Sequence, residues 1–244
     1  MTGGMLFLMT KKINYYPVAD PKNETPHFPI PSVKVIPDWY KKIGTYQNGD
    51  SSVRIFPNSN DVNSTAKWCN PFLDGLTMGY MITLQDDVLV SKIDGYVNFK
   101  WRTDRIAVSG HALDQFSTKG IPPEYALEIF KFHNNVTFET PEGYSTLFTH
   151  PLNRFDLPFL TFSGVVDTDT YKLPTNFPFI IKNTFEGVLE AGTPIAQAIP
   201  FKRESWQGVE NPYDSVKVQF QHDSYYKKIV RPYKNLIWHK KSYQ

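Results

Sequence analysis

The stretch that decides the fold runs from Ser163 to Phe201 and reads SGVVDTDTYKLPTNFPFIIKNTFEGVLEAGTPIAQAIPF. Short apolar runs rich in Val, Ile and Phe alternate in it with Gly, Pro, Asp and Asn, which end strands and form turns. Gly192 permits a tight hairpin before the last apolar run. We therefore expect a dense C-terminal β region with strands over 159–166, 177–182, 185–190 and 195–202.

On the N-terminal side of this stretch, turn residues again separate short apolar runs. Aromatic residues make up 15% of the chain and Pro occurs 19 times, a combination that favours pleated, half-buried strands. Asp94-Gly95 is a hairpin signal between two of the expected strands. Further strands are expected over 53–56, 80–84, 88–91, 96–101, 127–132, 136–138 and 144–149.

Helix is expected only in short pieces. Residues 10–50 are Pro-rich and predict extended chain. One helical turn is expected after Pro37, with Asp38 as its N-cap, and another over 71–76 that carries Asp74. We predict an all-β fold, β-dominated with a few short helical turns. The predicted organisation is a single β-rich domain over 1–244, with an extended N-terminal arm over 10–50, a β core over 51–206 and a C-terminal tail over 207–244.

Bulk composition excludes several classes of protein. A net charge of +2 gives no general attraction to nucleic acid. The C-terminal tail is more basic and interleaves Lys and Arg with Tyr and Trp, so it could meet phosphate or an acidic partner, form a solvated tail, or pack on a neighbouring subunit. No segment approaches the roughly 20 apolar residues of a membrane span. The single cysteine, Cys69, excludes an internal disulfide, favours intracellular synthesis, and is expected to be a buried small apolar residue.

A set of polar residues could carry chemistry in the C-terminal half. Asp167 ends an apolar strand, and Asp169 lies two residues on, on the same side of extended chain. Two close carboxylates raise the pKa of one of them or bind a cation, so Asp169 is a candidate metal ligand and Asp167 a candidate catalytic carboxylate. Arg203 could meet a phosphate or a carboxylate. The candidate ligand-binding residues are Tyr171, Asn153, Arg154, His150, Gln197 and Arg203.

A purely structural interpretation of the same residues is also open. The two aspartates could accept hydrogen bonds from turn amides, Arg154 could pair with a nearby Asp, and Gln197 could satisfy buried backbone groups. A cupin-like metal centre formed by His111, Asp114, His133 and His150 is a weaker alternative, because the spacing is His-x-x-Asp where the oxygenase triad has His-x-Asp.

The phrases Gly164-Val-Val-Asp-Thr-Asp-Thr-Tyr171 and Ala191-Gly-Thr-Pro-Ile-Ala-Gln-Ala198 resemble, in this order, the C-terminal half of the dUTPase and dCTP-deaminase superfamily. The resemblance implies a β-clip core and a nucleotide site. By this likeness Asp167 would orient the attacking water, Tyr171 would stack on the sugar, and Mg²⁺ would be held by the triphosphate. The family's Arg-Ser-Gly phrase is absent, and Asn153-Arg154 stands near its place.

A second resemblance covers most of residues 35–206 and is to an uncharacterised family of tailed phages. It rests on residues 37–41, 69–74, 144–154, 164–169 and 193–203. This likeness implies a viral protein of the host cytoplasm or the virion, without an established activity. Two functions follow as expectations. One is binding, with or without hydrolysis, of a nucleotide or related phosphorylated small molecule; the other is a non-catalytic virion structural or assembly protein. Under either function we expect a homo-oligomer, such as a trimer.

Overall fold

The computed structural model describes residues 10–18, 25–45, 65–111, 118–226 and 233–244. The chain divides into two compact units. Unit 1 consists of Met1–Ile30, Gly79–Pro151 and Phe155–Arg203, and unit 2 consists of Pro31–Met78, Leu152–Arg154 and Glu204–Gln244. Each unit is built from segments that are distant in sequence.

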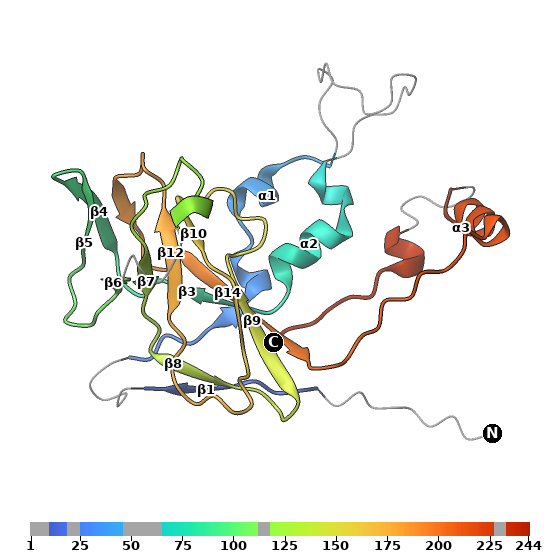
Figure 1. Ribbon diagram of the computed structural model, residues 1–244, viewed down its shortest axis with the longest axis horizontal. Coiled ribbons are helices and arrows are strands. Elements are labelled where there is room, and N and C mark those ends of the chain that lie inside the picture. Colours follow the sequence, from blue (N-terminus) through green and yellow to red (C-terminus); the bar gives the residue numbers. More distant parts are fainter. Residues whose placement is uncertain (1–9, 19–24, 46–64, 112–117, 227–232) are drawn as a thin grey trace, which may run out of the picture. The chain divides into compact units, whose positions relative to one another are not determined.

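Unit 1 contains almost all of the β structure, arranged in four sheets (Figure 1). The largest sheet has the order β11 (Gly164–Val166), β9 (Tyr144–Thr149), β14 (Pro194–Lys202), β3 (Tyr80–Thr83) and β2 (Ile30–Pro31). A four-stranded sheet has the order β10 (Phe159–Thr161), β12 (Phe177–Ile181), β7 (Phe130–Phe132) and β6 (Val108–Gly110). The smaller sheets are β13 (Gly187–Leu189), β4 (Val88–Ile93) and β5 (Tyr96–Lys100), and β1 (Asn14–Pro17) with β8 (Val136–Glu139).

Strand β14 is the centre of the largest sheet. It runs antiparallel to β9 on one side and to β3 on the other, with a register shift between Pro194 and Ala196. Its first six residues, 194–199, are all buried. A run of buried residues on both faces is typical of a strand that is covered on both sides. At its C-terminal end Lys202 lies opposite Tyr144 of β9.

A close backbone approach explains a glycine at the start of β3. Gly79 has φ of +68°, and a Cβ added there would lie 2.1 Å from the carbonyl oxygen of Ala198. A side chain at this position would therefore clash with β14 as well as strain the backbone.

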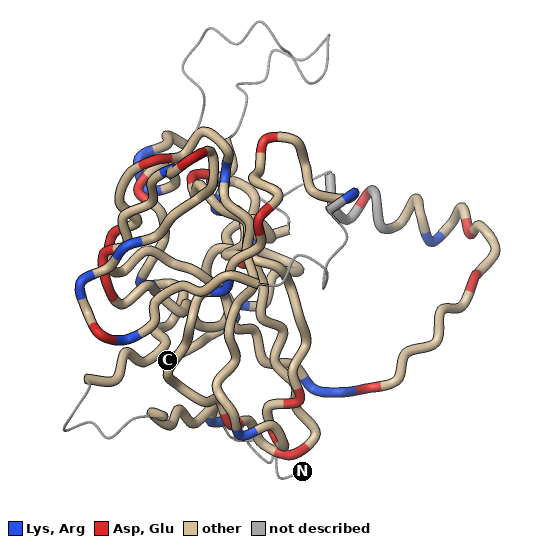
Figure 2. The backbone as a smooth tube through the Cα atoms, turned by 60° about the vertical axis from the view of Figure 1, so that its left-hand side comes forward, with Lys and Arg blue, Asp and Glu red and all other residues tan. Residues whose placement is uncertain are grey.

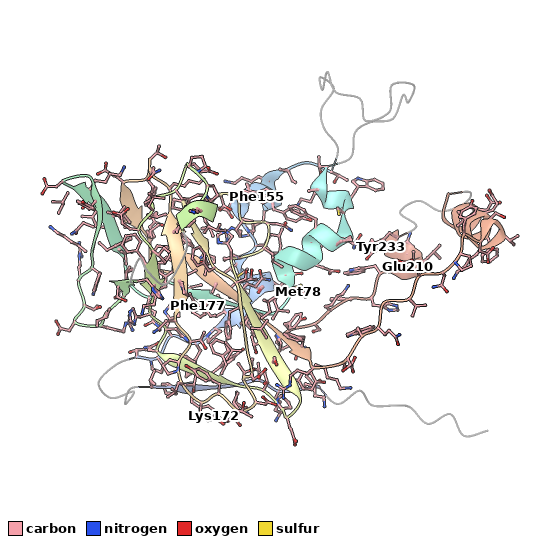
Figure 3. The ribbon with its side chains drawn as sticks, viewed as in Figure 1. Met78, Phe155, Lys172, Phe177, Glu210 and Tyr233 are labelled. Carbon is pink, nitrogen blue, oxygen red and sulfur yellow. The ribbon has the colours of Figure 1, made fainter. Side chains whose placement is uncertain are left out.

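Aromatic side chains fill the core of unit 1. The rings of Phe132 and Phe179 stack with their centroids 3.7 Å apart, and Phe159 packs edge-on against Phe132 at 5.1 Å. Strand β12 supplies Phe177, labelled in Figure 3, along with Phe179. Burial of several such rings, each of about 150–250 Å², is the main source of stability in this unit.

Unit 2 contains the short helices. These are η1 (Ser32–Val35), α1 (Asp38–Lys42), η2 (Ala66–Trp68) and α2 (Asn70–Thr77). Tyr40 of α1 is buried and stacks on Phe72 of α2, with the ring centroids 6.0 Å apart. Pro71 lies in the first turn of α2, where its missing N–H costs nothing.

The C-terminal part of unit 2 contains α3 (Ser215–Tyr226) and the π-helical turn η5 (Tyr233–Ile237). Asp214 caps α3, because its side chain accepts a hydrogen bond from the backbone N–H of Lys217 at 3.0 Å. The end of the chain is attached to α2. Asp74 accepts hydrogen bonds from Trp238 Nε1 at 2.9 Å and from Lys241 Nζ at 2.6 Å.

The predicted all-β class is confirmed at the level of a β-dominated chain with few short helices, while the β-clip core stays a prediction. The expected hairpin at Asp94-Gly95 is present between β4 and β5, and both residues have positive φ. The expected helical turn with Asp74 is part of α2. The strand predicted over 53–56 lies outside the described residues.

Four expectations were wrong in detail. The strand predicted over 159–166 is two strands, β10 and β11, which belong to different sheets. Asp38 is the first residue of α1 and makes no capping bond; it binds Lys41 instead. Cys69 is exposed, not buried; it lies at the junction of η2 and α2, where its carbonyl oxygen accepts a hydrogen bond from the backbone N–H of Leu73. Helix α3 lies in the predicted tail, where no helix was expected.

Candidate functional site

The chain makes a single tight turn directly after β11. The carbonyl oxygen of Asp167 accepts hydrogen bonds from the backbone N–H of Thr170 at 3.0 Å and of Tyr171 at 2.8 Å. The bond from Tyr171 spans four residues, as in one turn of α-helix, so the backbones of these two residues lie within one turn of each other. Both side chains are exposed, and that of Asp167 is 62% exposed. The sequence spacing is therefore compatible with a joint role of Asp167 and Tyr171.

Asp169 lies on the inner side of this turn and holds Arg203. Its side chain is only 4% exposed and accepts hydrogen bonds from the backbone N–H of Gly143 at 2.9 Å and from Arg203 Nη1 at 3.0 Å. A second bond, from Arg203 Nη2, makes the ion pair bidentate. The hydrogen bond from Arg203 is the main reason why the pKa of Asp169 falls to about 2, and the bond from Gly143 acts in the same direction.

Arg203 also joins Asp167 to strand β9. Its Nη1 lies 3.4 Å from Asp167 Oδ1, donates to Ser145 Oγ at 3.0 Å and donates to the carbonyl oxygen of Tyr144 at 3.1 Å. Ser145 Oγ in turn donates to Asp167 Oδ1 at 2.6 Å. Two carboxylates thus share one guanidinium, so the cluster is acidic overall. Its charge suits a cation or a positioned water better than an unaccompanied phosphate.

Three buried threonine hydroxyls lie beneath the turn. Thr168 Oγ1 is 2.8 Å from Thr140 Oγ1 and 2.8 Å from Thr146 Oγ1. The Thr140 hydroxyl continues to the carbonyl oxygen of Tyr144 at 3.1 Å. This chain of hydrogen bonds fixes the turn against β9 and was not predicted. Its signal in the sequence is Thr168, a short hydroxyl residue that lies between Asp167 and Asp169 directly after an apolar strand.

The structure does not bring all the predicted ligand-binding residues to this surface. Gln197 is fully buried in β14, between its partners Met81 and Thr149. His150 is half-buried, and its Nδ1 accepts a hydrogen bond from the backbone N–H of Thr161 at 3.3 Å. In this conformation both side chains serve the interior of unit 1.

Asn153 and Arg154 belong to unit 2, while the other candidates belong to unit 1. Asn153 has φ of +59°, a conformation that Asn tolerates better than most residues. Its Nδ2 donates to the carbonyl oxygen of Phe72 in α2 at 3.1 Å. Asn153 therefore attaches its short segment to α2.

The alternative metal centre gains no support from the described residues. His133 Nε2 lies 2.8 Å from Ser109 Oγ, and burial lowers the pKa of this histidine. Asp114 lies outside the described residues. Within the part of the chain that the structure describes, no three His, Cys, Asp or Glu side chains are grouped as metal ligands would be.

Comparison with known proteins does not assign the chain to a family. None of the described helices is both long and apolar enough to cross a membrane. No family model matches the sequence, and no curated protein matches it either.

Proposed function

We propose that this protein is a non-catalytic assembly protein, of the virion structural or assembly class, that binds a partner through residues 204–220. We call this stretch the docking segment. In this proposal the protein acts in the virion or in the host cytoplasm during infection.

Exposure of apolar side chains along the docking segment carries the proposal. Trp206 is 89% exposed, Tyr213 81% and Phe220 72%. Val209, Val216 and Val218 are exposed as well. Single exposed apolar residues are common on proteins, but such a concentration within one short segment marks an interaction site.

The candidate site in unit 1 supports the same conclusion. Arg203 and Asp169 are engaged with each other, and Gln197 and His150 serve the interior. A phosphate would have to compete with two carboxylates for Arg203. Four of the candidate residues thus make contacts that stabilise the fold of unit 1.

Particle fractionation tests the proposal. A triple variant, Trp206→Ser, Tyr213→Ser and Phe220→Ser, removes exposed side chains and is expected to fold normally. In cells that produce the protein, the wild type should co-sediment with large particles and the triple variant should remain at the mass of the free chain. Equal sedimentation of the two proteins, with both in particles or both free, would contradict the proposal. Far-ultraviolet circular dichroism of both proteins is the control for folding.

Binding of a nucleotide or related phosphorylated small molecule, with or without hydrolysis, is the second candidate. It is favoured by the turn that brings Asp167 and Tyr171 within four residues of each other with both side chains exposed. In this function Asp167 would orient a water or a Mg²⁺ brought by the phosphates, and Tyr171 would stack on a ring.

A thermal-shift screen distinguishes the second candidate from the first. Deoxynucleotides, ribonucleotides and cyclic nucleotides are each tested with and without Mg²⁺. A ligand at 100 times its Kd adds about 2.7 kcal/mol to the free energy of unfolding. Asp167→Asn should remove the shift, whereas Asp104→Asn, at another exposed aspartate of unit 1, should keep it. No shift across the whole panel would reject nucleotide binding.

A further inference from the structure

The docking segment is large enough for a stable interface. Trp206, Tyr213 and Phe220 are each more than two-thirds exposed, and aromatic side chains of this kind bury about 150–250 Å² apiece. With the three valines, the segment offers an area near the roughly 800 Å² per partner of a standard protein interface. Figure 3 shows the side chains of this segment around Glu210.

The segment is also acidic. Residues 204–220 contain Glu204, Glu210 and Asp214 against one basic residue, Lys217. The charges can be followed along the backbone in Figure 2. A partner surface should therefore combine apolar side chains with Lys or Arg.

A surface with that composition exists at the end of this same chain. Residues 233–241 contain Lys234, Lys240 and Lys241 and no acidic residue. Leu236 and Ile237 are exposed among these lysines. We call residues 233–241 the basic segment. The chain thus carries an acidic aromatic surface and a basic apolar surface with complementary charge.

Within one chain the two segments do not cover each other. Trp206, Tyr213 and Phe220 are exposed in the docking segment, and Leu236 and Ile237 are exposed in the basic segment. The basic segment is held instead on α2, because Trp238 and Lys241 both bind Asp74. The exposed apolar side chains of both segments are therefore available to another molecule.

We propose that the docking segment of one copy binds the basic segment of a second copy. This proposal rests on the proposed function and names the partner. If the exchange is reciprocal, two copies form a dimer with two-fold symmetry and two equivalent contacts; if it continues in one direction, the same contact builds a ring or a filament.

Analytical ultracentrifugation of the full chain tests the proposal at two salt concentrations. At about 50 mM NaCl the wild type should associate in a concentration-dependent manner, and at about 500 mM NaCl the association should weaken, since exposed charges are screened. The triple variant of the docking segment should weaken association by about 100-fold or more, because aromatic anchors dominate interface energies.

Charge reversal shows whether the contact joins two copies. Glu210→Lys alone and Lys234→Glu alone should each weaken self-association by about tenfold, because like charges then oppose each other in every contact. An equimolar mixture of the two variants should regain association, since each contact between unlike variants pairs opposite charges again. Asp104→Lys, an exposed reversal in unit 1, is the matched control and should associate like the wild type.

The outcomes separate this proposal from the function on which it rests. In one outcome the wild type stays monomeric at every concentration, while the triple variant is lost from particles. This outcome overturns the second copy as the partner and keeps the assembly function. Wild-type self-association that the triple variant does not weaken overturns the docking segment as the contact. Absence of rescue in the mixture overturns the pairing of the two segments.

Discussion

The ion pair between Asp169 and Arg203 leads to a prediction about acid stability. The pKa of Asp169 is lowered from 3.8 to about 2 in the folded protein, chiefly by the hydrogen bond from Arg203. A carboxyl with a depressed pKa stabilises the folded state above its unfolded pKa, and this stabilisation is lost as the pH falls through the folded pKa. The window in which Asp169 contributes to acid unfolding therefore lies between about pH 4 and pH 2.

The size of the effect follows from the two pKa values. At pH 3 the carboxyl is about 0.85 protonated in the unfolded chain and about 0.1 protonated in the folded one, so unfolding takes up about 0.8 proton at this residue. Urea unfolding measured between pH 2.5 and pH 5 gives the slope of the unfolding free energy against pH. Asp169→Asn should be less stable at neutral pH and should lose this part of the slope.

Asp104→Asn is the control and should leave the slope in that window less affected than Asp169→Asn. Arg203→Gln should also flatten the slope, because without the guanidinium the pKa of Asp169 returns toward its ordinary value. If Asp169→Asn has the wild-type slope between pH 2.5 and pH 4, the ion pair with Arg203 does not lower the pKa of Asp169 in solution. The structural role given to Asp169 would then be wrong.

Three further predictions concern residues of unit 1. Phe179→Ala should lower the free energy of unfolding by about 3–5 kcal/mol in urea titrations, because this fully buried ring stacks at the centre of the aromatic core. Gly79→Ala should lower the free energy of unfolding by more than the roughly 1–2 kcal/mol of a left-handed residue, since its Cβ would meet the carbonyl oxygen of Ala198. Gly192→Ala, in open space with φ of +88°, should lower it by no more than this amount. The pKa of His133 is lowered by burial, so the unfolded state takes up a proton first as the pH falls below about 6.5, and the slope of stability between pH 7 and pH 5.5 should decrease in His133→Gln.

The sequence predicted the β class well because turn residues separate the strands locally. Asp94-Gly95 and Gly192 both occur at turns with positive φ, where their conformational preferences act without help from distant residues. The division between β10 and β11 at Ser163 depends instead on residues that are distant in sequence. The stretch 159–166 was predicted as one strand, yet its two halves join different sheets through pairing with β12 and β9. Helix α3 was overlooked although its signal is local, with Asp214 before a stretch free of Gly and Pro.

The candidate site was predicted in part. The structure brings together Asp167, Asp169 and Arg203. The sequence did not predict that the Asp169 side chain would be buried and would bind the arginine. That outcome depends on Gly143, which is distant in sequence and supplies a backbone amide. Gln197 was singled out for its polarity, and its burial follows from the position of β14 inside the sheet.

The contact at Arg203 also bears on how the protein would withstand a pulling force. Arg203 is the last residue of unit 1, and Glu204 begins the docking segment. Tension applied to that segment would peel β14 away from β9, starting at the pair Lys202–Tyr144. The bidentate bond to Asp169 and the backbone bond from Arg203 to Gly143 lie at the point where peeling must begin. Under tension on the docking segment, the contacts of Arg203 would therefore resist the separation of β14 from β9.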